Sequence, residues 1–154
     1  MNKHRRAVWW GPLCFRDPVL LCGVLYPLLW FDASGFLRLG LAAALLHELG
    51  HVAAYGLLRH RFPVIEVTLT GFCMRTRGED FLPGETLFLA AAGPAVNVLL
   101  AAGQGMLLAR QATIRGSAFL AANLLTGAFN LLPFPPLDGA QMMQSVCALL
   151  QRTD

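Results

Sequence analysis

The 154-residue chain is 56% hydrophobic and only 14% charged, with a mean hydropathy of +0.54. Soluble domains carry about 25% charged residues, so this chain has too little polar surface to cover a water-facing globule. Its net charge of +3 comes from scattered basic residues, which argues against the clustered Lys and Arg of a nucleic-acid-binding protein. Composition therefore predicts a single domain, residues 1–154, embedded in a lipid bilayer.

The N-terminal sequence MNKHRRAVWWGPLCF is basic and then apolar. Because it lacks an A-x-A-type cleavage site, we expect a cytoplasmic anchor with Trp9 and Trp10 at the membrane interface, not a removed signal peptide. The first apolar stretch runs from Val19 to Phe31. It is shorter than the ~20 residues of a spanning helix, so we expect it to be tilted or to extend back towards Trp9.

Two further apolar stretches, Phe36 to about Leu58 and Pro83 to Ala109, are each long enough to cross a bilayer. Between them, Val64 to Thr70 is rich in β-branched residues and predicts one or two strands at the membrane surface. One hypothesis is that this strand binds an extended substrate by edge pairing. A surface strand without substrate contact is an equally good interpretation.

The fourth apolar stretch, Ser117 to Leu150, is too long for one crossing and is interrupted at Pro133–Pro136. Prolines cannot donate backbone hydrogen bonds and disfavour helix before them. Unwound backbone at membrane depth is tolerated where it is buried in protein or lines a wet cavity, so we expect a helix broken at a functional site. The alternative is two helices joined by a surface turn. The predicted fold is an all-α polytopic membrane protein with about four transmembrane helices, the last one broken, and a short surface β segment.

The basic residues predict that both termini are cytoplasmic. Four crossings place more Lys and Arg on the side of the N-terminal cluster than on the other side, in agreement with the positive-inside rule. The larger group is Lys3, Arg5, Arg6, Arg59, Arg61, Arg75, Arg77 and Arg152, and the smaller is Arg110, Arg115 and, near that end of the second stretch, Arg38.

A metal-binding pattern lies inside the second stretch, where LLHELGHVAAYG contains His47, Glu48 and His51. Histidines four residues apart lie about 40° apart around a helix, so both imidazoles can reach one ion. Glu48 can serve as general base without being a ligand. Each ionisable residue in a membrane segment costs about 2.5–3.5 kcal/mol, and such residues are usually functional. The pattern favours a metal site over a buried polar network or a chance match.

A tetrahedral catalytic zinc needs a third protein ligand and an open position for water. Asp138 follows the proline cluster and is the only acid in the fourth apolar stretch, so we favour it as that ligand, although it is also a good N-cap for the next helix. At 1.5 Å per residue, His51 lies about 10 Å from the cytoplasmic end of its helix. Asp138, about a dozen residues before the C-terminal polar tail, is expected to lie somewhat deeper, but close enough to share one site. The remaining acids fall in or beside the polar connection and are expected to be solvated charges: Glu66, Glu79, Asp80 and Glu85.

Three motifs together resemble the site-2 protease family of intramembrane zinc metalloproteases, in a minimal form. They are HELGH in the second stretch, AAGPAVN in the third and NLLPFPPLDG in the fourth, and the resemblance covers about Leu39 to Gln151. It implies a catalytic core over about 36–151 and one Zn2+ per chain, held by His47, His51 and Asp138, with Glu48 activating water.

The resemblance also implies roles for two asparagines. Asn130 is expected to bind substrate or stabilise the oxyanion, and Asn97 to support the site. The usual second glycine after the aspartate is Ala140 here, which removes no ligand. No PDZ or CBS-like domain is expected.

The predicted function is that of a zinc metalloendopeptidase acting on a transmembrane protein substrate. It would hydrolyse a peptide bond in or near a membrane span after the substrate helix has unwound, with Glu48 as general base. One alternative is a non-proteolytic metal-binding membrane protein, such as a carrier or scaffold. Another is a membrane metalloprotease that cuts soluble or surface segments.

Overall fold

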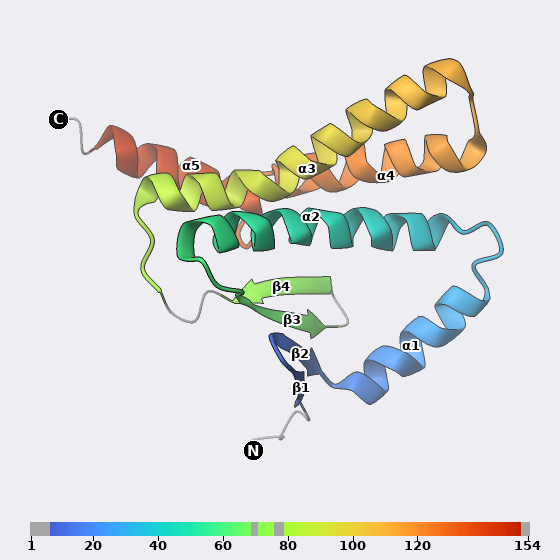
Figure 1. Cartoon of the computed structure of the whole chain (residues 1–154), viewed down its shortest axis with the longest axis horizontal. Coiled ribbons are helices and arrows are strands. Elements are labelled where there is room, and N and C mark those ends of the chain that lie inside the picture. Colours follow the sequence, from blue (N-terminus) through green and yellow to red (C-terminus); the bar gives the residue numbers. More distant parts are fainter. Residues whose placement is uncertain (1–6, 69–70, 76–78, 152–154) are drawn as a thin grey trace.

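The structure, a computed structural model, describes residues 7–68, 71–75 and 79–151 (Figure 1). These residues form five helices and one four-stranded sheet. The helices are α1 (Pro18–Trp30), α2 (Phe36–Arg59), α3 (Pro83–Arg110), α4 (Ile114–Asn130) and α5 (Asp138–Leu150); the strands are β1 (Ala7–Trp10), β2 (Leu13–Arg16), β3 (Val64–Thr68) and β4 (Gly71–Arg75). The fold is mostly helical as predicted, but its sheet is larger than expected. Some basic residues used above to orient the chain lie outside the described residues: Lys3, Arg5, Arg6, Arg77 and Arg152.

Two helices, α2 with 24 residues and α3 with 28, are long and apolar enough to cross a membrane. At 1.5 Å per residue they measure about 36 and 42 Å, against a hydrocarbon core of about 30 Å. The other helices have 13, 17 and 13 residues, so the four crossings stay a prediction. The turn before α2 supplies its missing acceptors, since Asp32 accepts a hydrogen bond from the N–H of Arg38 and Ser34 from that of Phe36.

Helix α3 lies at the centre of the bundle and packs against α2, α4 and α5, while α1 stands apart and reaches mainly α2 (Figure 1). Small residues allow this close packing. A Cβ atom at Gly50 of α2 would lie 2.7 Å from the carbonyl oxygen of Ala92 on α3. One at Gly127 of α4 would lie 3.2 Å from Cβ of Asn97. Glycine at such positions lets the backbones of membrane helices approach one another.

The fourth apolar stretch is broken at its prolines, as predicted, and forms two helices separated by residues 131–137. Gly139, the second residue of α5, allows the start of α5 to pack against the end of α4. A Cβ atom there would overlap the carbonyl oxygen of Leu131 and lie 2.7 Å from that of Leu132. The start of α5 therefore lies directly against the end of α4, and this contact determines where Asp138 enters the bundle.

The sheet has the order β1-β2-β3-β4 and lies beside the C-terminal half of α2 (Figure 1). β1 and β2 form an antiparallel hairpin, β2 pairs in parallel with β3, and β3 pairs antiparallel with β4. Residues 7–16 thus form a β-hairpin, so the expected backward extension of the first helix is wrong and α1 begins at Pro18. β3 has a partner on each side, so the hypothesis that its own edge binds substrate is also wrong. Within the described residues, β4 lies at the sheet edge.

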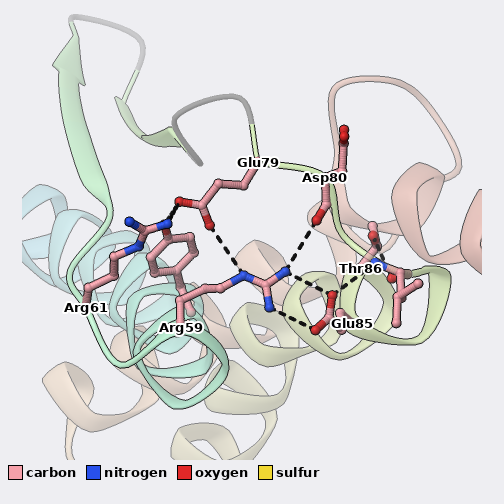
Figure 2. Close-up of polar contacts among 8 residues, drawn as sticks. Arg59, Arg61, Glu79, Asp80, Glu85 and Thr86 are labelled. Carbon is pink, nitrogen blue, oxygen red and sulfur yellow. Dashed lines mark hydrogen bonds and ion pairs between the residues drawn. The ribbon is translucent and has the colours of Figure 1, made fainter.

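An ion-pair cluster joins the end of α2 to the start of α3 (Figure 2). Two guanidinium nitrogens of Arg59 lie 2.9 and 3.0 Å from the carboxylate oxygens of Glu85, and its Nε lies 3.3 Å from Oε2 of Glu79. The same guanidinium stacks over the ring of Phe81, 4.5 Å from its centroid. Glu79 also pairs with Arg61. Glu79 and Glu85 are therefore paired, not the free solvated charges that were expected.

The cluster reaches the core through Tyr55. Its hydroxyl donates to Oε1 of Glu79 at 3.0 Å, and the residue is fully buried in a cluster with Ala54 and Leu89. A third expected solvated acid, Glu66 on β3, is buried, and Arg16 of β2 pairs with it at 2.7 Å. The contacts of Tyr55 and Arg59 hold the helix that carries the two histidines against the start of α3, whereas the Arg16–Glu66 pair joins two strands within the sheet.

Candidate metal centre

Helix α2 places His47 and His51 on one face, one turn apart, and both are buried. Their Nε2 atoms lie 3.1 Å from each other. Oδ2 of Asp138, from the first residue of α5, lies 3.0 Å from Nε2 of His47 and 3.3 Å from that of His51. The structure thus brings together the three side chains proposed as ligands. Leu137 occupies the N-cap position and no side-chain cap bond is present there, so Asp138 is not used as the cap.

The partners of the two Nδ1 atoms determine the tautomer of each imidazole. Nδ1 of His51 lies 2.8 Å from the carbonyl oxygen of Leu89, and Nδ1 of His47 lies 2.6 Å from Oδ1 of Asn97. Both partners are acceptors, so each neutral imidazole carries its proton on Nδ1. Each Nε2 then presents a bare lone pair. Two lone pairs and a carboxylate oxygen within about 3 Å repel one another unless a cation lies between them.

This arrangement fits a zinc ion. Tetrahedral zinc with bonds of about 2.0–2.2 Å holds its ligand atoms about 3.3–3.5 Å apart, and the observed separations of 3.0, 3.1 and 3.3 Å are close to this. Two imidazoles and one carboxylate are a common catalytic zinc set that leaves a fourth position open. Gly93 of α3 keeps the space beside these atoms free, because a Cβ there would lie 2.6 Å from Nε2 of His47 and overlap Nε2 of His51.

Glu48 lies next to these ligands without joining them. It is half-buried and close enough to interact electrostatically with His47, His51 and Asp138. The cluster of candidate ligand atoms within 4.8 Å of one another comprises only those three residues among the described ones. Glu48 therefore lies beside the three candidate ligands without being one of them, as a general base for zinc-activated water must.

The two asparagines singled out in the sequence lie in different environments. Asn97 is 1% exposed and contacts His47 directly. Asn130, the last residue of α4, is half-buried and donates from Nδ2 to the carbonyl oxygen of Thr126 on its own helix, 3.0 Å away. The hydrogen bonds found among the described residues do not join Asn130 to the metal ligands.

One residue of the site was missed. Asn123 of α4 is completely buried and its Oδ1 accepts from Nδ2 of Asn97 at 3.0 Å. A signal for it existed in the sequence: an amide in the apolar run FLAANLLTGAFN, seven residues before Asn130. Polar residues in such segments face the interior of the bundle and are commonly functional.

The chain is similar in sequence to Rip3, a protein of Mycobacterium tuberculosis whose name describes it as a zinc metalloprotease. The two are 32% identical over 124 residues, in each of two strains of that organism. The match covers 75% of this chain, and the chain spans about a third of the length of these curated relatives, 32%. No protein-family profile matches the chain.

The fold is similar to a solved structure, that of the site-2 protease from Methanocaldococcus jannaschii. The TM-score is 0.67 at 20% identity, over 93% of this chain and 71% of that one. At this identity the likeness shows a shared fold. The sequence match and the fold match agree with each other and with the family inferred from the motifs, and the chain belongs to the site-2 protease family.

Proposed function

We propose that the chain is an intramembrane zinc protease that hydrolyses a peptide bond in or near a membrane span of a protein substrate. The observation that carries this proposal is the convergence of two bare imidazole nitrogens and one carboxylate oxygen between α2 and α5. It supports a metal site for hydrolysis because three protein ligands leave a fourth position on a tetrahedral zinc, and Glu48 is close enough to interact with all three ligand residues.

A bound zinc would polarise the scissile carbonyl and lower the pKa of a water in the open position to about 7. Glu48 would act as the general base that accepts a proton from the water attacking the carbonyl carbon. Glu48 would then return that proton to the amine nitrogen of the leaving group as the C–N bond breaks. Asn130, at the end of α4 and before the turn that leads to Asp138, is proposed to donate a hydrogen bond to the substrate carbonyl oxygen, where negative charge develops.

β4 is the strand that we propose to bind the unwound substrate. It lies at the sheet edge and contacts α2, the helix that carries His47 and His51. An extended peptide added to that edge would hydrogen-bond to the β4 backbone. Edge pairing is sequence-tolerant, which suits a protease that must first unwind a helical substrate.

We further propose that the face carrying the sheet is cytoplasmic, with both chain termini on that side of a multi-pass protein. The end of α2 near the sheet carries Arg59, and Arg61 follows two residues after it. The opposite end of the bundle carries Arg110 and Arg115, at the junction of α3 and α4. A cytoplasmic position for Arg59 and Arg61 accords with the positive-inside rule, which motivates this orientation.

The test compares the purified protein with Glu48→Gln and with Asp80→Asn, which makes the same carboxylate-to-amide change at an exposed position. Glu48→Gln should retain zinc and lose cleavage, whereas Asp80→Asn should retain both. Peptide ends would be identified by mass spectrometry of membranes from cells expressing each form. Zinc binding without new peptide ends in the wild type would favour a non-proteolytic metal-binding protein. Comparing membrane-spanning and soluble versions of one cleaved peptide would separate intramembrane from surface cleavage.

A further inference from the structure

Asn123 lies at the middle of α4 and uses both ends of its side-chain amide. Its Nδ2 donates to the carbonyl oxygen of Phe119, 2.9 Å away on the same helix, and its Oδ1 accepts from Nδ2 of Asn97 at 3.0 Å. Asn123 is 0% exposed, and Asn97 is 1% exposed. Neither amide can exchange these partners for water, so each bond must be satisfied within the protein.

The donor and acceptor in each of these hydrogen bonds are determined by the Phe119 carbonyl. The carbonyl oxygen of Phe119 can only accept, so Nδ2 of Asn123 must face it and Oδ1 of Asn123 must face Asn97. That oxygen requires a donor, which turns Nδ2 of Asn97 towards Asn123 and Oδ1 of Asn97 towards His47. Nδ1 of His47 must then carry the proton. The Phe119 carbonyl, which can only accept, thus determines which atom of each amide is oxygen and which is nitrogen.

We propose that Asn123 is a positioning residue for the metal site, acting through Asn97 on the tautomer and orientation of His47. The polar relay comprises the Phe119 carbonyl, Asn123, Asn97 and His47. It keeps Nε2 of His47 bare and aimed at Oδ2 of Asp138, 3.0 Å away. Without Asn123, the remaining acceptor for Nδ2 of Asn97 is the Ala43 carbonyl at 3.4 Å, too long to hold the amide in one orientation.

Packing around Asn97 supports this role. Gly127 lies one turn beyond Asn123 on the same face of α4, and both are buried. A Cβ atom at Gly127 would lie 3.2 Å from Cβ of Asn97. One face of α4 therefore holds Asn97 in two ways, by the hydrogen bond to Asn123 and by close contact at Gly127. Together these restrict the rotamer of Asn97 and the direction of its amide.

The inference depends on the proposed zinc site but not on proteolysis, so its test measures zinc affinity. Full-length protein in detergent is titrated with zinc against a competing chelator. Asn123→Leu should weaken zinc binding about tenfold, the lower end of what outer partners of metal-binding histidines contribute. Thr126→Val removes a polar group from the same helix outside the relay and should leave the zinc affinity unchanged.

A double substitution distinguishes two roles for Asn123: orienting the metal site, or only holding α3 against α4. Asn97→Asp replaces the amide with a carboxylate, in which both oxygens accept hydrogen bonds. The oxygen that takes the place of Nδ2 would face Oδ1 of Asn123, and the two acceptors would repel each other. Adding Asn123→Leu removes that repulsion and should tighten zinc binding, the opposite of its effect on the wild type. If Asn123 only held α3 and α4 together, the second substitution would weaken binding in both backgrounds, and the proposal would be overturned.

One measurement needs no substitution. In zinc-loaded wild type with 15N-labelled histidine, the relay predicts that His47 binds zinc through Nε2 and shows a hydrogen-bonded Nδ1–H resonance. Binding through Nδ1 would overturn the proposal even if Asn123→Leu failed to fold. Zinc binding with these features but without cleavage by the wild type would contradict the proposed protease function and leave the relay supported.

Discussion

Oδ1 of Asn97 lies 2.6 Å from Nδ1 of His47, across the interface between α3 and α2. Histidines that bind metals commonly donate their second N–H to an oxygen acceptor, which orients the ring and raises its basicity. Gly93 lies one turn before Asn97 on the same helix and leaves room beside the Nε2 atom of the same ring. The AAGPAVN segment therefore shapes the site at both nitrogens of His47, although it supplies no ligand.

Replacing Asn97 with Leu should weaken zinc binding about 10–100-fold, because His47 would lose the acceptor that holds its tautomer. The measurement is chelator competition on the purified protein. Asn130→Leu is the matched control, since its side chain bonds to its own helix at the Thr126 carbonyl. That variant should bind zinc as the wild type does. Equal zinc affinities for Asn97→Leu and the wild type would contradict the role assigned to Asn97.

Gly93→Ala should also reduce zinc affinity, because the added methyl group would overlap the imidazole of His51 and crowd that of His47. Gly103→Ala on the same helix is the control, since a Cβ there meets no other atom within 4 Å. Alanine is about 1 kcal/mol more favourable than glycine inside a helix, so Gly103→Ala should be neutral or mildly stabilising. Zinc titration and thermal unfolding of both variants would reveal whether crowding outweighs helix propensity at Gly93.

The long helices could be predicted from the sequence because their apolar runs have sharp ends. The stretch expected from Phe36 to Leu58 is α2 (Phe36–Arg59), and that from Pro83 to Ala109 is α3 (Pro83–Arg110). In each case a charged residue ends the run, and a turn-forming Gly35 or the helix-starting Pro83 begins it. The break of the last stretch was predictable for the same kind of local reason, the loss of donors at consecutive prolines.

The N-terminal hairpin was missed because its stabilising contacts are non-local. AVWW and LCFR flank Gly11, whose φ of +60° suits a turn, but the sequence of this segment reads equally well as an interfacial anchor. β2 is secured by parallel pairing with β3, about fifty residues later in the chain. Local patterns carry no information about such a partner, and parallel pairing needs a long connection. Asn123 was missed for a similar reason, since its importance depends on which helix it faces.

Tyr55→Phe tests whether the ion-pair cluster stabilises the fold without acting on the metal. The substitution keeps the buried ring and removes the hydroxyl that donates to Glu79 at 3.0 Å. Hydrogen bonds to charged groups contribute about 1.5–3 kcal/mol, and Glu79 keeps its arginine partners, so a loss of about 1–2 kcal/mol in unfolding free energy is expected. Zinc affinity should not change. A large loss of zinc binding with normal stability would show that the cluster instead positions the histidines.

Asp138 is either a metal ligand or a purely structural acid at the start of α5, and one substitution distinguishes the two roles. Asp138→Asn preserves shape and one oxygen but removes the negative charge that faces two bare imidazole nitrogens at 3.0 and 3.3 Å. Loss of a direct ligand should exceed the 10–100-fold effect of losing an outer partner, so zinc affinity should fall by more than about 100-fold. A structural acid in the first turn of α5 would instead contribute about 0.3–1 kcal/mol through the helix dipole and leave zinc binding unchanged. Asp80→Asn serves again as the exposed control. Zinc titration and thermal unfolding of the two variants would separate these roles, because a ligand affects chiefly the first measurement and a helix-start residue only the second.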